Sequence, residues 1–126
     1  MENFNITNKT KVNLPDLPFL NMKNHVLGKD YSLSLVIVGE GEIHNLNKKY
    51  RNVDSPTDIL SFPLEKDSGE MFICQEIAKK KAPDFDREYE NFLSFLFIHG
   101  LVHLLGHDHG EEMEKIEEVN RKHFQI

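Results

Sequence analysis

The sequence predicts an α+β fold, in which a small mixed β-sheet of three to four strands is covered by about five helices. The run LSLVIV at 33–38 is apolar and rich in β-branched residues, which is typical of a buried strand. The segment FLSFLFI at 92–98 is apolar on nearly every side, which is typical of a helix in the core. With 126 residues, of which 39% are hydrophobic, the chain is expected to form a single domain over residues 1–126.

Helices are expected on both sides of the first strand. Within residues 14–28 the apolar positions have mixed helical spacing and the segment ends in glycine, which predicts a short N-terminal helix after or around Pro18. The segment GEGEIHNLNKKYR at 39–51 places Ile43, Leu46 and Tyr50 on one helical face, and we expect that face to pack on the sheet.

The second half of the chain predicts two strands and three helices. The short runs DILSFP at 58–63 and EMFIC at 70–74 are separated by a polar loop, which favours an antiparallel pair. Pro83 divides the first two helices that follow. The three helices are expected over residues 75–82, 86–105 and 110–123.

Composition narrows the class of protein. The net charge of −6 argues against a general nucleic-acid binder, although basic residues gather at 48–51 and 79–81. No run approaches the ~18 apolar residues of a membrane span, and the first residues lack the apolar core of a secretory signal, so we expect a cytoplasmic protein. The single Cys74 follows an apolar run and is expected to be buried and inert.

The segment HGLVHLLGHDH at 99–109 has the spacing of a metal site. His99 and His103 stand one helical turn apart, so both imidazoles can reach one ion. Gly106 allows the chain to turn back and present His109, as the third histidine does in the metzincin pattern H-x-x-x-H-x-x-G-x-x-H. We therefore expect a metal-binding central helix and one divalent ion, zinc, held by His99, His103 and His109.

Two residues of this segment have open roles. His107 offers a competing imidazole, although a lining or exposed position is favoured for it. Asp108 is either an acceptor that orients a ligand imidazole or a cap near the start of the last helix.

The expected chemistry is hydrolysis. Three imidazoles leave an open fourth position on a tetrahedral zinc, where the pKa of water falls to about 7. The residue after the first histidine is Gly100, where metalloproteases keep a glutamate as general base. A peptidase would therefore need its base from elsewhere, such as Glu70 or Asp108.

The chain resembles the YbeY family of metal-dependent endoribonucleases in three blocks that occur in the family's order. The blocks are YRNVDSPTDILSFP at 50–63, GEMFIC at 69–74 and HGLVHLLGHDH at 99–109. The likeness runs from about residue 33 to residue 110. The departures are small and consist of Met71 for isoleucine, Val102 for leucine and His107 for tyrosine.

This resemblance implies the zinc-type site of His99, His103 and His109 and a functional role for Arg51. It also implies a single-strand-specific metallo-endoribonuclease that hydrolyses RNA phosphodiester bonds in 16S rRNA 3′-end maturation and ribosome quality control. The partners would be single-stranded or ribosomal RNA and the small ribosomal subunit, with no membrane and no DNA.

Arg51 would clamp a phosphate, because a planar guanidinium matches two phosphate oxygens. A salt bridge to Asp54 or Asp58 is the structural alternative. Thr57 and Ser61 could bind substrate, but beside Pro56 we expect turn-forming roles for them.

Two other functions stay open. A metal-dependent hydrolase of another class, such as a peptidase or an esterase, is favoured by the metzincin-like spacing and the acidic charge. A non-catalytic ribosome-assembly factor would use the metal to hold its fold together, although closed structural sites usually have four protein ligands.

Overall fold

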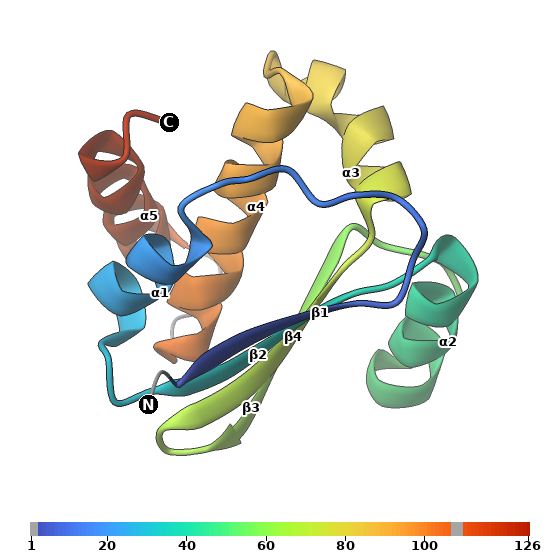
Figure 1. Cartoon of the computed structure of the whole chain (residues 1–126), viewed down its shortest axis with the longest axis horizontal. Coiled ribbons are helices and arrows are strands. Elements are labelled where there is room, and N and C mark those ends of the chain that lie inside the picture. The colour runs from blue at the N-terminus through green and yellow to red at the C-terminus, as the bar shows by residue number, and fades with distance from the viewer. Residues whose placement is uncertain (1–2, 107–109) are drawn as a thin grey trace.

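The computed structural model describes residues 3–106 and 110–126 (Figure 1). Within these residues the chain forms four strands, five α-helices and one short 3-10 helix, η1. In chain order they are β1 (Phe4–Asn8), α1 (Phe19–Leu27), β2 (Ser32–Ile37), α2 (Glu40–Arg51), β3 (Ile59–Glu65), β4 (Ser68–Ile73), α3 (Gln75–Lys81), η1 (Ala82–Phe85), α4 (Tyr89–Leu104) and α5 (Glu111–His123).

The strands form one mixed sheet in the order β1-β2-β4-β3. The first three strands in this order run parallel, and β3 runs antiparallel to β4. The expected hairpin of β3 and β4 is therefore confirmed, with Ile59 opposite Ile73 and Phe62 opposite Glu70. The mixed sheet and the helices around it make an α+β fold, as the sequence predicts.

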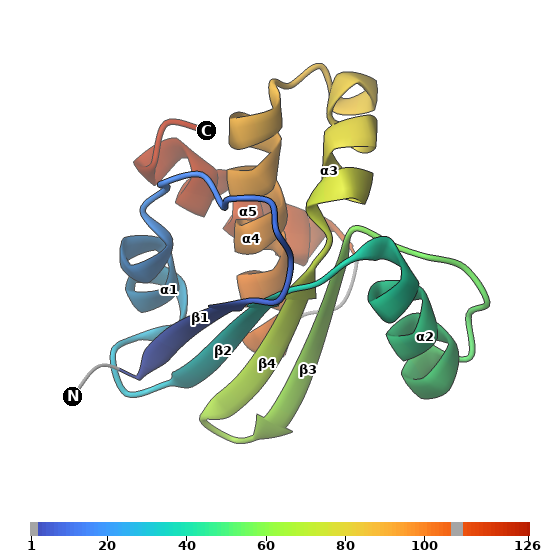
Figure 2. The same cartoon turned by 45° about the vertical axis from the view of Figure 1, so that its right-hand side comes forward.

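Residues on the two faces of the sheet belong to two core clusters. Leu33, Leu35 and Ile37 of β2 pack in the larger cluster with residues of α1 and α4. Val36 of the same strand packs in the smaller cluster with Ile43 of α2. Figures 1 and 2 show the corresponding layers, with α2 on one side of the sheet and the other α-helices on the opposite side.

The helix α4 is the central helix of the larger layer. Helices α1, α3 and α5 and strand β3 all contact it, which is why a helix that is apolar on nearly every side is stable here. His99 and His103, toward its C-terminal end, are only partly buried. Most residues of α4 are thus buried, whereas these two imidazoles lie at the edge of the core. No helix in the described part of the chain is long and apolar enough to cross a membrane.

Two details differ from the sequence-based expectations, and a third agrees with them. Strand β1 is not predicted by the sequence, because it is short and polar apart from Phe4 and Ile6 and joins the edge of the sheet through backbone pairing with β2. The N-terminal helix expected after or around Pro18 is confirmed and begins at Phe19, after a segment that two prolines keep non-helical. Tyr50 does not share the burial of Ile43 and remains 59% exposed.

Candidate functional site

Two histidines on α4 form the centre of the candidate site. The ring centroids of His99 and His103 lie 4.7 Å apart, with the rings nearly perpendicular at 88°. Both residues line one cavity of about 670 Å³. The prediction that one helical turn brings these two imidazoles together is therefore confirmed. His109, the expected third ligand, and its neighbours His107 and Asp108 lie outside the described residues.

A buried carboxylate orients the first histidine. Oε1 of Glu117 on α5 lies 2.9 Å from Nδ1 of His99, and the Glu117 side chain is only 7% exposed. The guanidinium of Arg121, one turn further along α5, lies 3.8 Å from the same oxygen. A neutral imidazole that donates from Nδ1 carries its lone pair on Nε2, the atom that can bind a metal.

This carboxylate–histidine pair suits a divalent ion. Histidine ligands of metals commonly donate their other ring N–H to a carboxylate, which fixes the orientation and raises the basicity of the ligand nitrogen. The sequence analysis missed Glu117 and assigned the orienting role to Asp108 as one of two possibilities. The available signal was an apolar helical spacing through Met113 and Ile116 that places Glu117 on the buried side of α5.

Arg51 lines the same cavity from the last turn of α2. The helix ends there because Asn52 adopts a left-handed conformation with φ of 59°. Neither aspartate proposed as its structural partner is paired with it among the described residues. Asp54 pairs with His44 at 2.8 Å, and Asp58 lies 3.6 Å from Lys81. Arg51 is thus an exposed cation at the border of the cavity.

Two hydroxyl groups also line the cavity. Ser61 lies in β3, with Oγ 3.4 Å from the carbonyl oxygen of Gly100, so the turn-forming role expected for it is wrong. Thr57 precedes that strand and donates a hydrogen bond to Asp58 at 3.3 Å. Both residues stand among the cavity's polar groups together with Arg51.

Gly100 brings α4 into close contact with the hairpin. A Cβ at this position would lie 2.7 Å from Cε of Met71 and 2.8 Å from both Cδ1 of Ile59 and Oγ of Ser61. No side chain fits here without a shift of these neighbours. A glutamate at the position after His99, as in metalloproteases, would therefore force these neighbours to move.

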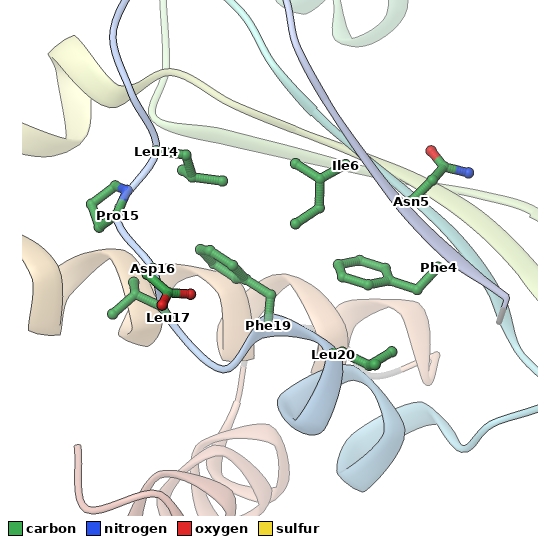
Figure 3. A pocket seen from close by; sticks show the side chains of 9 residues that line it. All are labelled: Phe4, Asn5, Ile6, Leu14, Pro15, Asp16, Leu17, Phe19 and Leu20. Carbon is green, nitrogen blue, oxygen red and sulfur yellow. The ribbon is translucent and has the colours of Figure 1, made fainter.

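Two further features do not belong to the candidate site. They are Cys74 and an apolar hollow beside β1, at the edge of the sheet opposite β3. Cys74 is fully buried, as expected, and burial raises the pKa of its thiol, which disfavours the reactive thiolate. Figure 3 shows the hollow, of about 530 Å³, with Phe4, Ile6 and Phe19 in its lining. Among the described residues that line this hollow, Asp16 is the one charged residue. The hollow therefore lacks a pair of charged groups that could act together in catalysis.

Fold and site together define a class of small α+β protein in which a central helix presents two histidines, one held by a carboxylate, to a cavity bordered by an arginine. A model of the family described as Endoribonuclease YbeY matches residues 5–126, and the chain belongs to this family.

Individual relatives agree with this assignment. The chain is 38% identical over 127 residues to an Endoribonuclease YbeY of Aliarcobacter butzleri (strain RM4018), covering 93% of this chain and 89% of the relative. It is 36% identical over 112 residues to that of Staphylococcus carnosus (strain TM300), covering 79% of this chain and 73% of the relative. The solution structure of TM1509 from Thermotoga maritima superposes with a TM-score of 0.66 at 29% identity, covering 97% of this chain and 91% of that one.

Proposed function

We propose that this chain is a metal-dependent endoribonuclease that cleaves single-stranded RNA in the cytoplasm. Family membership supports RNA as the substrate. The observation that carries the catalytic role is the pair formed by His99 and Glu117 in a cavity bordered by Arg51. The finer biological role that we propose is 16S rRNA 3′-end maturation and ribosome quality control, with the small ribosomal subunit as partner.

In this proposal His99, His103 and His109 hold one divalent ion, zinc. When bound, such an ion supplies Lewis acidity toward a phosphate oxygen and lowers the pKa of water to about 7. Glu117 keeps His99 in the tautomer and orientation that metal binding requires. Arg51 binds two oxygens of the scissile phosphate and stabilises the negative charge that develops on them during attack.

The products identify the attacking oxygen. Attack by the neighbouring RNA 2′-hydroxyl would leave a 2′,3′-cyclic phosphate, and it would be abolished by a single 2′-deoxy nucleotide at the cleavage point. Attack by water would leave a linear phosphate and tolerate that substitution. Mass spectrometry of the two product ends separates these chemistries.

The experiment that tests the function is cleavage of a labelled single-stranded RNA by zinc-loaded wild type and by His103→Ala, purified identically. We expect cleavage by the wild type, loss of cleavage on chelation, and no cleavage by the variant. Equal cleavage by both proteins would reveal a contaminating nuclease and refute the proposal. A casein digest run in parallel tests the peptidase alternative, which the crowding at Gly100 disfavours.

Circular dichroism of the same variant separates catalysis from a structural role for the metal. If His103→Ala stays folded and inactive, the ion acts in catalysis. If the variant unfolds, the ion holds the fold together, and the assembly-factor function gains support.

A further inference from the structure

A second cavity continues the candidate site on the other side of His99. It has a volume of about 360 Å³, and Asp58, Ile59 and His99 line both cavities. Beyond these shared residues it is bordered by Phe85 and Arg121. The second cavity therefore lies directly beside the position of a phosphate bound at Arg51 and His99.

An exposed aromatic ring borders the second cavity. Phe85, the last residue of η1, is 49% exposed. Its ring packs on Phe92 and Phe95 of α4, with centroid distances of 4.9 Å and 5.6 Å. This packing fixes the position of Phe85 while about half of the residue remains accessible. A ring that is both rigid and accessible is suited to stacking against a flat ligand.

Two arginines pack on the neighbouring ring of Phe95, and of these Arg121 lines the second cavity. The guanidinium carbon of Arg87 lies 4.5 Å from the ring centroid of Phe95, and that of Arg121 lies 5.0 Å from it. Planar guanidinium groups and aromatic rings are the two kinds of side chain on which unpaired bases stack in single-strand binding proteins.

The charges in the second cavity favour a base over a phosphate. Of its acidic residues, Asp58 lies 3.6 Å from Lys81, and Glu117 is paired with His99 and lies 3.8 Å from Arg121. Glu114 is exposed at its border. Three carboxylates and one arginine line this cavity among the described residues, so a phosphate would be repelled. A neutral base has N–H groups that can donate hydrogen bonds to a carboxylate.

We propose that the cavity bordered by Phe85 and Arg121 is a base-binding subsite, in which an unpaired base next to the scissile phosphate stacks on Phe85. This inference rests on the proposed function, because it takes RNA as the ligand of the first cavity. A base inside a duplex has both faces covered by its neighbours, so the subsite selects single-stranded RNA.

The test combines variants of Phe85 with RNA oligonucleotides that each lack the base at one position. Phe85→Leu keeps an apolar side chain on Phe92 and Phe95 but removes the aromatic face, and Phe85→Trp restores that face. Affinity is measured by fluorescence anisotropy in the presence of chelator, so that it does not depend on cleavage. We expect Phe85→Leu to weaken binding by about 5- to 100-fold, as loss of one stacked base predicts, and Phe85→Trp to bind like the wild type.

The abasic series identifies the contact. One abasic position, adjacent to the cleaved bond, should weaken wild-type binding as much as Phe85→Leu does and should have no further effect in that variant. Val119→Ala, at a residue of α5 that is 67% exposed and outside both cavities, is the matched control and should bind normally.

The outcomes separate the two proposals. If the wild type binds and cleaves RNA but Phe85→Leu binds equally well, the subsite is refuted and the nuclease function stands. The same holds if all abasic positions affect wild type and variant alike. If the wild type neither binds nor cleaves single-stranded RNA, both proposals are refuted.

Discussion

The contact between His99 and Glu117 joins two residues that lie 18 positions apart in the chain. The carboxylate is buried, so its charge is stabilised by the imidazole N–H and by the nearby guanidinium of Arg121. Among the described residues, this hydrogen bond from α4 to α5 holds the His99 imidazole in place.

Glu117→Gln should weaken zinc binding by about 10- to 100-fold, because the amide is a weaker acceptor and no longer fixes the imidazole of His99. Competition with a chromophoric chelator measures the affinity. Glu118→Gln is the matched control, since Glu118 is exposed on the same helix and pairs with Lys122 at 3.2 Å. Equal zinc affinities for the two variants would contradict the role of Glu117.

Arg51→Ala should lower the rate of RNA cleavage by about 100-fold and leave zinc binding unchanged, because Arg51 lines the cavity and is not one of the three proposed zinc ligands. Single-turnover cleavage and zinc titration measure the two effects. Lys49→Ala removes a neighbouring positive charge outside the cavity and should retain most activity. If Arg51→Ala also lost zinc, Arg51 would not act on the phosphate alone, and the role proposed for it would be wrong.

At the scale of elements, α4 approaches the β3–β4 hairpin closely because Gly100 has no side chain. The same approach brings His99 and His103 to the cavity that β3 borders. The absence of a side chain at Gly100 therefore allows both the close packing of α4 on the hairpin and the position of the two imidazoles in the cavity.

Gly100→Ala should destabilise the protein by about 1–3 kcal/mol, because the added Cβ overlaps Met71, Ile59 and Ser61. Urea unfolding followed by circular dichroism gives the free energy of unfolding. Gly41→Ala is the control, since nothing lies within 4 Å of a Cβ at that position in α2, and it should leave stability unchanged or slightly higher. A similar stability for both variants would show that the contact relaxes at no cost.

A partly buried tyrosine links α4 to α3. Tyr89 donates a hydrogen bond to Oε1 of Gln75, and burial, with the nearby Cys74 and Glu90, raises the pKa of Tyr89 to about 12. The unfolded chain loses this proton near pH 10, whereas the folded protein retains it to about pH 12. The stabilisation is therefore fully present below about pH 10 and is lost as the pH rises toward 12.

The free energy of unfolding of the wild type should accordingly fall more steeply than that of Tyr89→Phe between pH 9.5 and about 12, a window set by the ordinary and raised pKa of Tyr89. Urea titrations at several pH values measure the two slopes. Parallel slopes would show that Tyr89 ionises equally in both states.

At the scale of the whole molecule, the sheet joins the two core clusters. Leu35 and Val36 are neighbours in one strand, yet they belong to different clusters, as do Met71 and Phe72. Loss of either cluster exposes one face of the same strands, so neither half is expected to survive alone.

We therefore expect the chain to unfold in one transition, as a single domain. Far-ultraviolet circular dichroism reports the helices, and fluorescence of the three tyrosines reports local packing, because the chain contains no tryptophan. The two signals should give the same midpoint in urea. Separate midpoints would indicate that the α2 side of the sheet unfolds independently of α4.

Local patterns predicted most of the elements. The apolar runs at 33–38 and 92–98 identified β2 and α4, because burial on every side leaves a continuous apolar signal. The edge strand β1 escaped prediction, because its stability comes from backbone pairing with β2 and leaves only a weak trace in residue type. Tyr50 packs on Phe62 of β3, as its helical face predicts, but helical spacing does not reveal that it stays 59% exposed.

The sequence by itself determined the pairing of His99 with His103, since one helical turn is a local geometry that spacing fully specifies. It also determined the α+β class and the family, which three short blocks carry. Only the tertiary structure decided that Glu117 orients His99, that Ser61 lines the cavity, and that the cavity continues to Phe85. These contacts join separate elements, and their formation depends on how α4, α5 and the sheet pack together, which periodicity along one segment does not encode.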